Sequence, residues 1–109
     1  MQQVFDTDSD ILYSAHDWLQ QGHIVALVTV LKTWGSAPRR PGALMVIHAD
    51  GRFSGSVSGG CIEDDLVQRV LRGEFEQQAP QLIEYGIDSA NAQRLGLPCG
   101  GRLELAVEY

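Results

Sequence analysis

An apolar run near the start of the chain, interrupted by one polar residue, most constrains what the chain can fold into. Residues Ile24–Leu31 read Ile-Val-Ala-Leu-Val-Thr-Val-Leu, with Thr29 as the single polar position. β-Branched side chains favour extended backbone, and a strand without polar alternation is typical of a position buried on both faces of a sheet. The run is too short to span a bilayer. It therefore predicts the central strand of a sheet in a globular domain.

Weaker patterns place further elements around that strand. Apolar residues at helical spacing predict helices over about 11–19 and 62–71. Alternating or β-branched runs predict strands at 43–48, 52–56, 81–85 and 103–107, and a short helix is predicted at 88–95. Two prolines and two glycines in 32–42 predict irregular backbone there. We therefore expect one α/β domain, α+β in character, over residues 1–109, with a mixed, largely antiparallel sheet of about five strands and helices packed on it.

Composition excludes several classes of partner. The chain has 109 residues, a net charge of −6 and eight Lys and Arg residues, so it is not expected to bind nucleic acid or a membrane surface, because phosphate-rich partners are held by basic side chains. Two cysteines do not form a disulfide framework. No secretory signal opens the sequence. Free thiols in the reducing cytoplasm are the expectation.

A glycine-rich segment precedes the second predicted helix. Gly55–Glu63 reads Gly-Ser-Val-Ser-Gly-Gly-Cys-Ile-Glu. Glycines permit a tight turn and close approach of a ligand, and free amides at a helix N-terminus attract anions. Cys61 stands at the mouth of the helix, where a thiolate is favoured, although Glu63 and the two aspartates after it oppose that charge. The pattern leaves open whether Cys61 is reactive or a small buried residue.

Two other segments carry chemistry. Arg39 and Arg40 form the single adjacent basic pair of an acidic chain, in a Pro-Arg-Arg-Pro turn close to Ser36. Such a turn suits either an anion or plain solvation. Cys99 lies on a second predicted tight turn, between a proline and the pair Gly100-Gly101. A catalytic pair of Cys61 with His48 is not supported by any spacing.

Together these segments resemble a known family. Thr33–Gly42, Gly55–Glu63 and Leu97–Gly101 are similar to the three signature blocks of the XdhC/CoxI family, which comprises accessory proteins of xanthine dehydrogenase and carbon monoxide dehydrogenase. The resemblance implies binding of the molybdenum cofactor (molybdopterin), its protection during sulfuration, and delivery to a molybdenum hydroxylase apoenzyme, with a cysteine desulfurase as the sulfur source. It implies a carrier and not a catalyst. Members commonly carry a second, nucleotide-fold domain, which these residues do not contain.

The resemblance also implies a binding site. The expected cofactor-binding residues are Ser36, Arg39, Arg40, Ser58, Gly59, Gly60, Cys61, Glu63, Cys99, Gly100 and Gly101. We expect the guanidinium groups to meet the cofactor phosphate and the glycine turn to meet the phosphate or an oxo group. The thiolates of Cys61 and Cys99 are expected to meet the soft metal. This requires the three blocks to converge in one pocket. Two alternatives stay open, namely a thiol-dependent enzyme using Cys61 and an assembly module that forms a homodimer without a small ligand.

Overall fold

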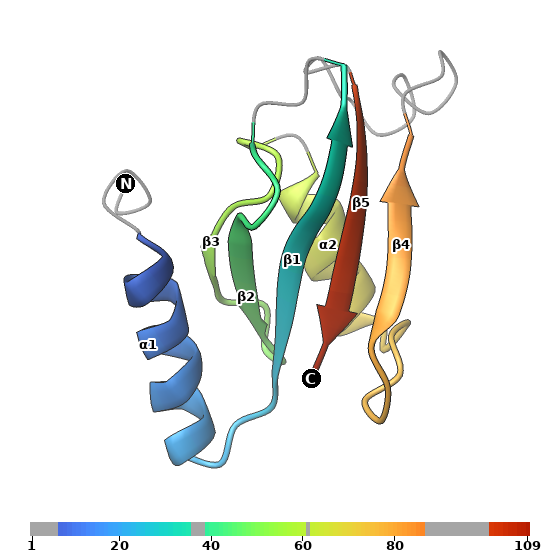
Figure 1. The fold of residues 1–109 in the computed structure, drawn as a ribbon. Coiled ribbons are helices and arrows are strands. Elements are labelled where there is room, and N and C mark those ends of the chain that lie inside the picture. Colours follow the sequence, from blue (N-terminus) through green and yellow to red (C-terminus); the bar gives the residue numbers. More distant parts are fainter. Residues whose placement is uncertain (1–6, 36–38, 61, 87–100) are drawn as a thin grey trace.

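The computed structural model describes residues 7–35, 39–60, 62–86 and 101–109 (Figure 1). The short helix predicted at 88–95 lies outside these residues. The elements in the described part are α1 (Asp8–Gln20), β1 (Val25–Trp34), β2 (Leu44–His48), β3 (Phe53–Gly55), α2 (Glu63–Leu71), β4 (Gln81–Tyr85) and β5 (Arg102–Glu108). No helix among them is long and apolar enough to cross a membrane.

The five strands form one sheet in the order β3-β2-β1-β5-β4. β1 therefore occupies the centre, as its apolar run predicts. The expected sheet of about five strands with packed helices is confirmed. All four pairings are antiparallel, so the sheet is not mixed within the described part of the chain. The reason is that β1, β2 and β3 follow one another as a meander, while β5 returns between β1 and β4.

β1 is longer than the apolar run predicts. Lys32, Thr33 and Trp34, in the segment expected to be irregular, continue the strand by pairing with β5 after a register shift beyond Val30. A partner strand supplies ladder hydrogen bonds that local composition does not encode. The guanidinium carbon of Arg102 on β5 also lies 4.4 Å from the ring centre of Trp34. The extension carries the chain to one end of the sheet.

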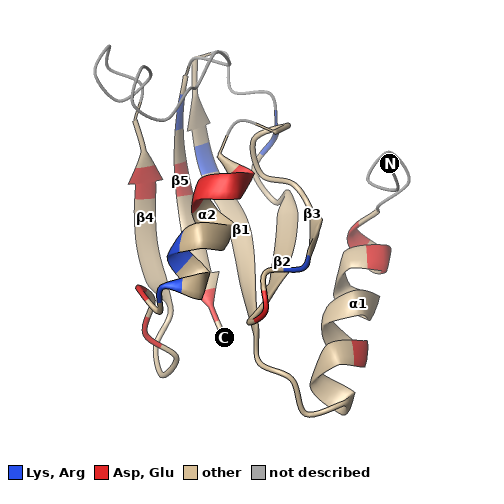
Figure 2. Ribbon diagram, turned by 180° about the vertical axis from the view of Figure 1, so that it is seen from behind, with Lys and Arg blue, Asp and Glu red and all other residues tan. Residues whose placement is uncertain are grey.

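A helix covers part of each face of the sheet. α2 lies on one face and α1 on the other, as the two opposite views show (Figures 1 and 2). Alternate side chains of the strands point to opposite faces of the sheet and form two separate cores. The larger core, on the α2 face, includes Ala26, Val28, Val30, Met45, Ile47, Leu66, Val70, Leu105 and Val107. The smaller core, beneath α1, is built on Ile11, Val25 and Val46.

α1 begins at a reciprocal cap, a little before residue 11, where the apolar spacing predicts the helix to start. The hydroxyl of Thr7 accepts a hydrogen bond from the amide of Asp10 at 3.1 Å, and the carboxylate of Asp10 accepts one from the amide of Thr7 at 3.1 Å. This is a capping box, which satisfies two amide donors at the helix end. It also fixes where α1 begins over the β1–β2–β3 half of the sheet.

Replacing Thr7 by alanine is expected to lower the free energy of unfolding by about 1 kcal/mol, because the Asp10 amide loses its acceptor. The matched control is Ser9→Ala, since Ser9 is an exposed residue in the first turn of α1. Urea denaturation of the two variants and the wild type measures the effect. Equal stability of the two variants would show that the cap does not hold the helix.

Candidate functional site

The described segments of the three sequence blocks lie at one end of the sheet. β1 and β3 end there, and β2, α2 and β5 begin there (Figure 1). Gly35, which follows β1, lies against Gly101, which precedes β5: a Cβ atom on Gly35 would be 3.1 Å from the Cα of Gly101. Gly35 also has a φ of +70°, a backbone conformation that favours glycine. The described parts of the first and third blocks are therefore in contact.

A surface hollow joins the first block to the second. It has a volume of about 450 Å³ and is lined by Arg39, Phe53, Gly55, Ser56, Gly59, Gly60, Glu63 and Asp64; we call it the glycine-turn hollow. Its size lies in the range of small-molecule sites. Arg39 also borders a neighbouring hollow of about 430 Å³, which Arg40 and Asp8 line as well. Arg39 is thus shared by the two hollows, whereas Arg40 borders the second.

The glycine turn, described at residues 56–60 and 62, is folded around the side chain of Glu63. Its Oε2 accepts hydrogen bonds from the Ser56 hydroxyl at 2.7 Å and the amides of Val57 and Ser58 at 2.9 and 2.8 Å. Its Oε1 accepts hydrogen bonds from the Ser58 hydroxyl at 2.6 Å and the amides of Gly60 and Ile62 at 3.0 and 3.2 Å. The Glu63 side chain is buried. This one carboxylate thereby accepts hydrogen bonds from most of the N–H and O–H donors in the described part of the turn.

The two serines of the turn extend this arrangement. The Ser56 hydroxyl accepts a hydrogen bond from the Gly59 amide at 2.8 Å, and the Ser58 hydroxyl accepts one from the Ile62 amide at 3.0 Å. Gly59 and Gly60 have φ values of +74° and +110°, which let successive amides point toward one carboxylate. The sequence predicts that amides of this turn bind an external anion. In the structure the amides of residues 57, 58, 60 and 62 donate hydrogen bonds to the Glu63 carboxylate instead.

The environment of Glu63 favours its ionised form. Burial raises the pKa of the Glu63 carboxyl, but hydrogen bonds from the side chains of Ser58 and Ser56 and from the backbone of Ser58 and Val57 outweigh burial, so that the pKa lies below its ordinary value. Glu63 also begins α2, whose first turn is acidic and whose last turn is basic (Figure 2). This charge order matches the helix dipole. The Glu63 carboxylate is therefore negative at neutral pH.

Comparison with known families settles which family this arrangement belongs to. The model of the XdhC and CoxI family matches residues 18–86, which include β1 to β4 and the whole glycine turn. The chain belongs to the XdhC and CoxI family. The resemblance seen in the sequence is thereby confirmed.

Relatives in the XdhC and CoxI family are longer than this chain. It is 37% identical to the molybdenum cofactor insertion chaperone PaoD of Escherichia coli, with 97% of the chain and 33% of the relative covered. It is 33% identical to a protein of Bacillus subtilis named as a probable subunit of xanthine dehydrogenase, with 83% and 28% covered. A crystal structure titled as a xanthine dehydrogenase from Bacillus halodurans matches with a TM-score of 0.67 and 27% identity, covering 89% of this chain and 29% of that one. The chain thus spans about a third or less of these relatives.

Several of the residues expected at the site can be placed. Arg39, Gly59, Gly60 and Glu63 line the glycine-turn hollow, and Ser58 is buried within the turn behind it. Gly101 lies at the same end of the sheet, against Gly35. Arg40 lines the neighbouring hollow and not the glycine-turn hollow. The other expected residues, Ser36, Cys61, Cys99 and Gly100, lie outside the described residues. Within the described part of the chain, no three His, Cys, Asp or Glu side chains are grouped to hold a metal.

Sequence analysis missed the part played by Ser56. Its hydroxyl lies between the Glu63 carboxylate and the Gly59 amide and also borders the hollow. The usable signal was the pair of serines followed by a glutamate at the start of a helix, because such residues exchange hydrogen bonds with nearby backbone amides. The spacing between these serines and Glu63 is longer than the three residues of a capping box, so the capping-box pattern does not reveal these hydrogen bonds.

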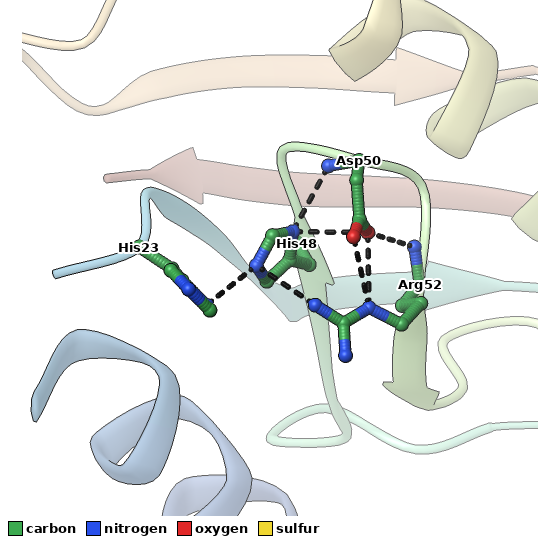
Figure 3. Close-up of polar contacts among 4 residues, drawn as sticks. All are labelled: His23, His48, Asp50 and Arg52. Carbon is green, nitrogen blue, oxygen red and sulfur yellow. Dashed lines mark hydrogen bonds and ion pairs between the residues drawn. The ribbon is translucent and has the colours of Figure 1, made fainter. Parts of the chain in front are cut away.

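His48 is directed away from the glycine turn. It ends β2, whose start at Leu44 is bonded to Ser56. Its Nε2 lies 2.9 Å from the Nδ1 of His23, and its Nδ1 accepts a hydrogen bond from the Asp50 amide at 2.9 Å (Figure 3). Because β2 separates this cluster from the turn, His48 belongs to the opposite end of the sheet. Cys61, the cysteine considered in the sequence as a partner of His48, lies outside the described residues.

Proposed function

We propose that this chain binds the molybdenum cofactor at the glycine-turn hollow and assists its sulfuration and its insertion into a xanthine dehydrogenase-type molybdenum hydroxylase. One observation carries the proposal: segments far apart in the sequence meet at one end of the sheet, Gly35 against Gly101 and Arg39 across a hollow from Gly59 and Gly60. The names of the relatives, a cofactor insertion chaperone and a probable xanthine dehydrogenase component, support a carrier and not a catalyst.

The described residues suit an anionic, planar cargo. Arg39 presents a planar guanidinium, which pairs with a phosphate through two hydrogen bonds. Gly59 and Gly60 are exposed and carry no side chains, so a flat pterin can approach their backbone. Arg40, at the neighbouring hollow, adds positive charge.

The remaining assignments rest on the family resemblance. Cys61 and Cys99 are proposed as soft ligands toward the metal-bound end of the cofactor. Ser36, Gly100 and Gly101 complete the proposed site.

The proposed partners follow from the same role. The hydroxylase apoenzyme receives the cofactor, and a cysteine desulfurase supplies the sulfur, in the cytoplasm. A homodimer is also proposed, because α1 leaves an apolar groove open beside the sheet, which includes Leu12, Leu19 and Leu27. Leu12 and Leu19 are about half exposed, and apolar side chains gathered in this way favour an interface.

Metal and pterin analysis tests the proposal. We expect protein purified from a cell that makes the cofactor to carry molybdenum and fluorescent pterin. Arg39→Gln should reduce the affinity for molybdopterin about tenfold or more, because a hydrogen bond to a charged group contributes about 1.5–3 kcal/mol. The matched control is Arg72→Gln, since Arg72 is exposed beyond the last turn of α2 and pairs with Glu74.

Two results would contradict the proposal. One is wild-type protein that carries neither molybdenum nor pterin, and the other is an Arg39→Gln variant that binds as tightly as Arg72→Gln. The thiols are tested separately by Cys61→Ser and Cys99→Ser. Unchanged molybdopterin binding in both single variants would remove the thiols from the site.

A further inference from the structure

We infer that Glu63 is the built-in anion of the glycine turn: its carboxylate holds the turn in shape and occupies the amides of residues 57, 58, 60 and 62, so that these amides do not bind an external anion. Six hydrogen bonds from five described residues converge on the two carboxylate oxygens. Amides arranged in this way at a helix N-terminus are the donors that bind phosphate in other proteins. Here they already have a permanent partner that belongs to the chain itself.

The charges around the turn support this assignment. In the described part of the chain, none of the ion pairs involves Glu63. Its negative charge is therefore balanced by the dipoles of the amides, the hydroxyls and the α2 N-terminus. An external anion placed at these amides would have to displace Glu63 or approach it closely, with Asp64 also lining the hollow. Both routes are unfavourable.

The inference changes how the proposed site works. The turn is held in one shape before any ligand arrives, so Gly59 and Gly60 are presented by a fixed backbone. Glu63 is then a positioning residue. If the cofactor binds here as proposed above, its phosphate must be met by Arg39 at the edge of the hollow and not by the turn. This last consequence rests on the proposed function, whereas the role of Glu63 does not.

A phosphate titration of the wild-type protein tests the inference without any variant. Backbone amide NMR signals of Val57, Ser58, Gly60 and Ile62 are expected to remain in place when inorganic phosphate is added, because their hydrogens are engaged by Glu63. Saturable shifts of these four signals would overturn the inference. The measurement needs no cofactor, so its outcome is distinct from that of the molybdenum and pterin analysis.

Chemical rescue gives a second test. Glu63→Ala removes the carboxylate and opens a space lined by its former donors. Formate is a small carboxylate, so it should bind there and raise the unfolding temperature of the variant by at least about 4 °C relative to the same concentration of chloride. It should also shift the four amide signals.

Asp64→Ala is the matched control for the rescue. It removes the same charge from the same helix end, but Asp64 is exposed, so no gain from formate is expected. A Glu63→Ala variant that folds and gains nothing from formate would overturn the inference. If that variant does not fold, the wild-type titration decides the question.

Discussion

Replacing Gly55 by alanine is expected to lower the free energy of unfolding by at least about 3 kcal/mol. Gly55 ends β3 and has a φ of +85°, a conformation that alanine adopts at a cost. A Cβ atom at this position would collide with the carbonyl oxygen of Leu44 and lie 2.7 Å from the Cδ1 of Ile11. Backbone on one side and the buried side chain of α1 on the other leave no room for adjustment.

Gly22→Ala is the control that separates steric collision from backbone strain. Gly22 has a φ of +82°, close to that of Gly55, but nothing lies within 4 Å of the position its Cβ would take. It should lose only about 1–2 kcal/mol. Urea denaturation of both variants measures the difference. Equal losses would mean that the Leu44 carbonyl and the Ile11 side chain do not pack closely against Gly55. These contacts would then not fix the start of the glycine turn.

The fold was largely predictable because its elements have strong local patterns. The β-branched run Ile24–Leu31 predicts the central strand, since only a position between two layers buries residues such as Val25 and Val28 on opposite faces. Gln81–Tyr85 was predicted with the bounds that the structure has. The extension of β1 to Trp34 was not predictable, because it depends on β5, which is distant along the chain.

The sequence predicted that three of the described residues would lie together, but it did not predict how the glycine turn is hydrogen-bonded. Arg39, Gly59 and Gly60 were all expected, and they meet at one hollow. Glu63 was expected to contact the cofactor or to oppose a thiolate. Within the described residues, its partners are amides and serine hydroxyls of the segment just before it. A hydrogen-bond acceptor on the first residue of a helix leaves no periodic signal. The two serines before Glu63 indicate local hydrogen bonding, but the folded backbone is needed to show which amides bond to Glu63.

Glu63→Gln is expected to destabilise the protein by at least about 3 kcal/mol at pH 7, because buried donors that lose an acceptor cost about 1–3 kcal/mol each. Each carboxylate oxygen accepts three hydrogen bonds. Glutamine replaces one of the two oxygens by an NH₂ group, which is a donor. The three donors that face this oxygen in the wild type would therefore lose their acceptor. The size and shape of the side chain hardly change, so the effect reports on the bonding of the ionised form.

The same variant should have an altered pH dependence. Because the pKa of the Glu63 carboxyl is lowered in the fold from its ordinary value of 4.5, its stabilising effect is full above about pH 4.5 and is lost as the pH falls through the lower, folded-state pKa. The stability difference between the wild type and Glu63→Gln should therefore be largest near neutral pH and shrink in acid. Urea denaturation at a series of pH values from about 7 to about 3 measures this.

Glu74→Gln separates this effect from general acid denaturation. The pKa of Glu74 is also lowered, by hydrogen bonds first from Arg72 and then from Arg69, but Glu74 is exposed, and an exposed ion pair contributes little. Its loss should leave the wild-type pH profile nearly intact. A difference between the wild type and Glu63→Gln that stays constant down to about pH 3 would mean that the turn does not depend on an ionised Glu63. In that case the amides of the turn would be open to an external anion after all.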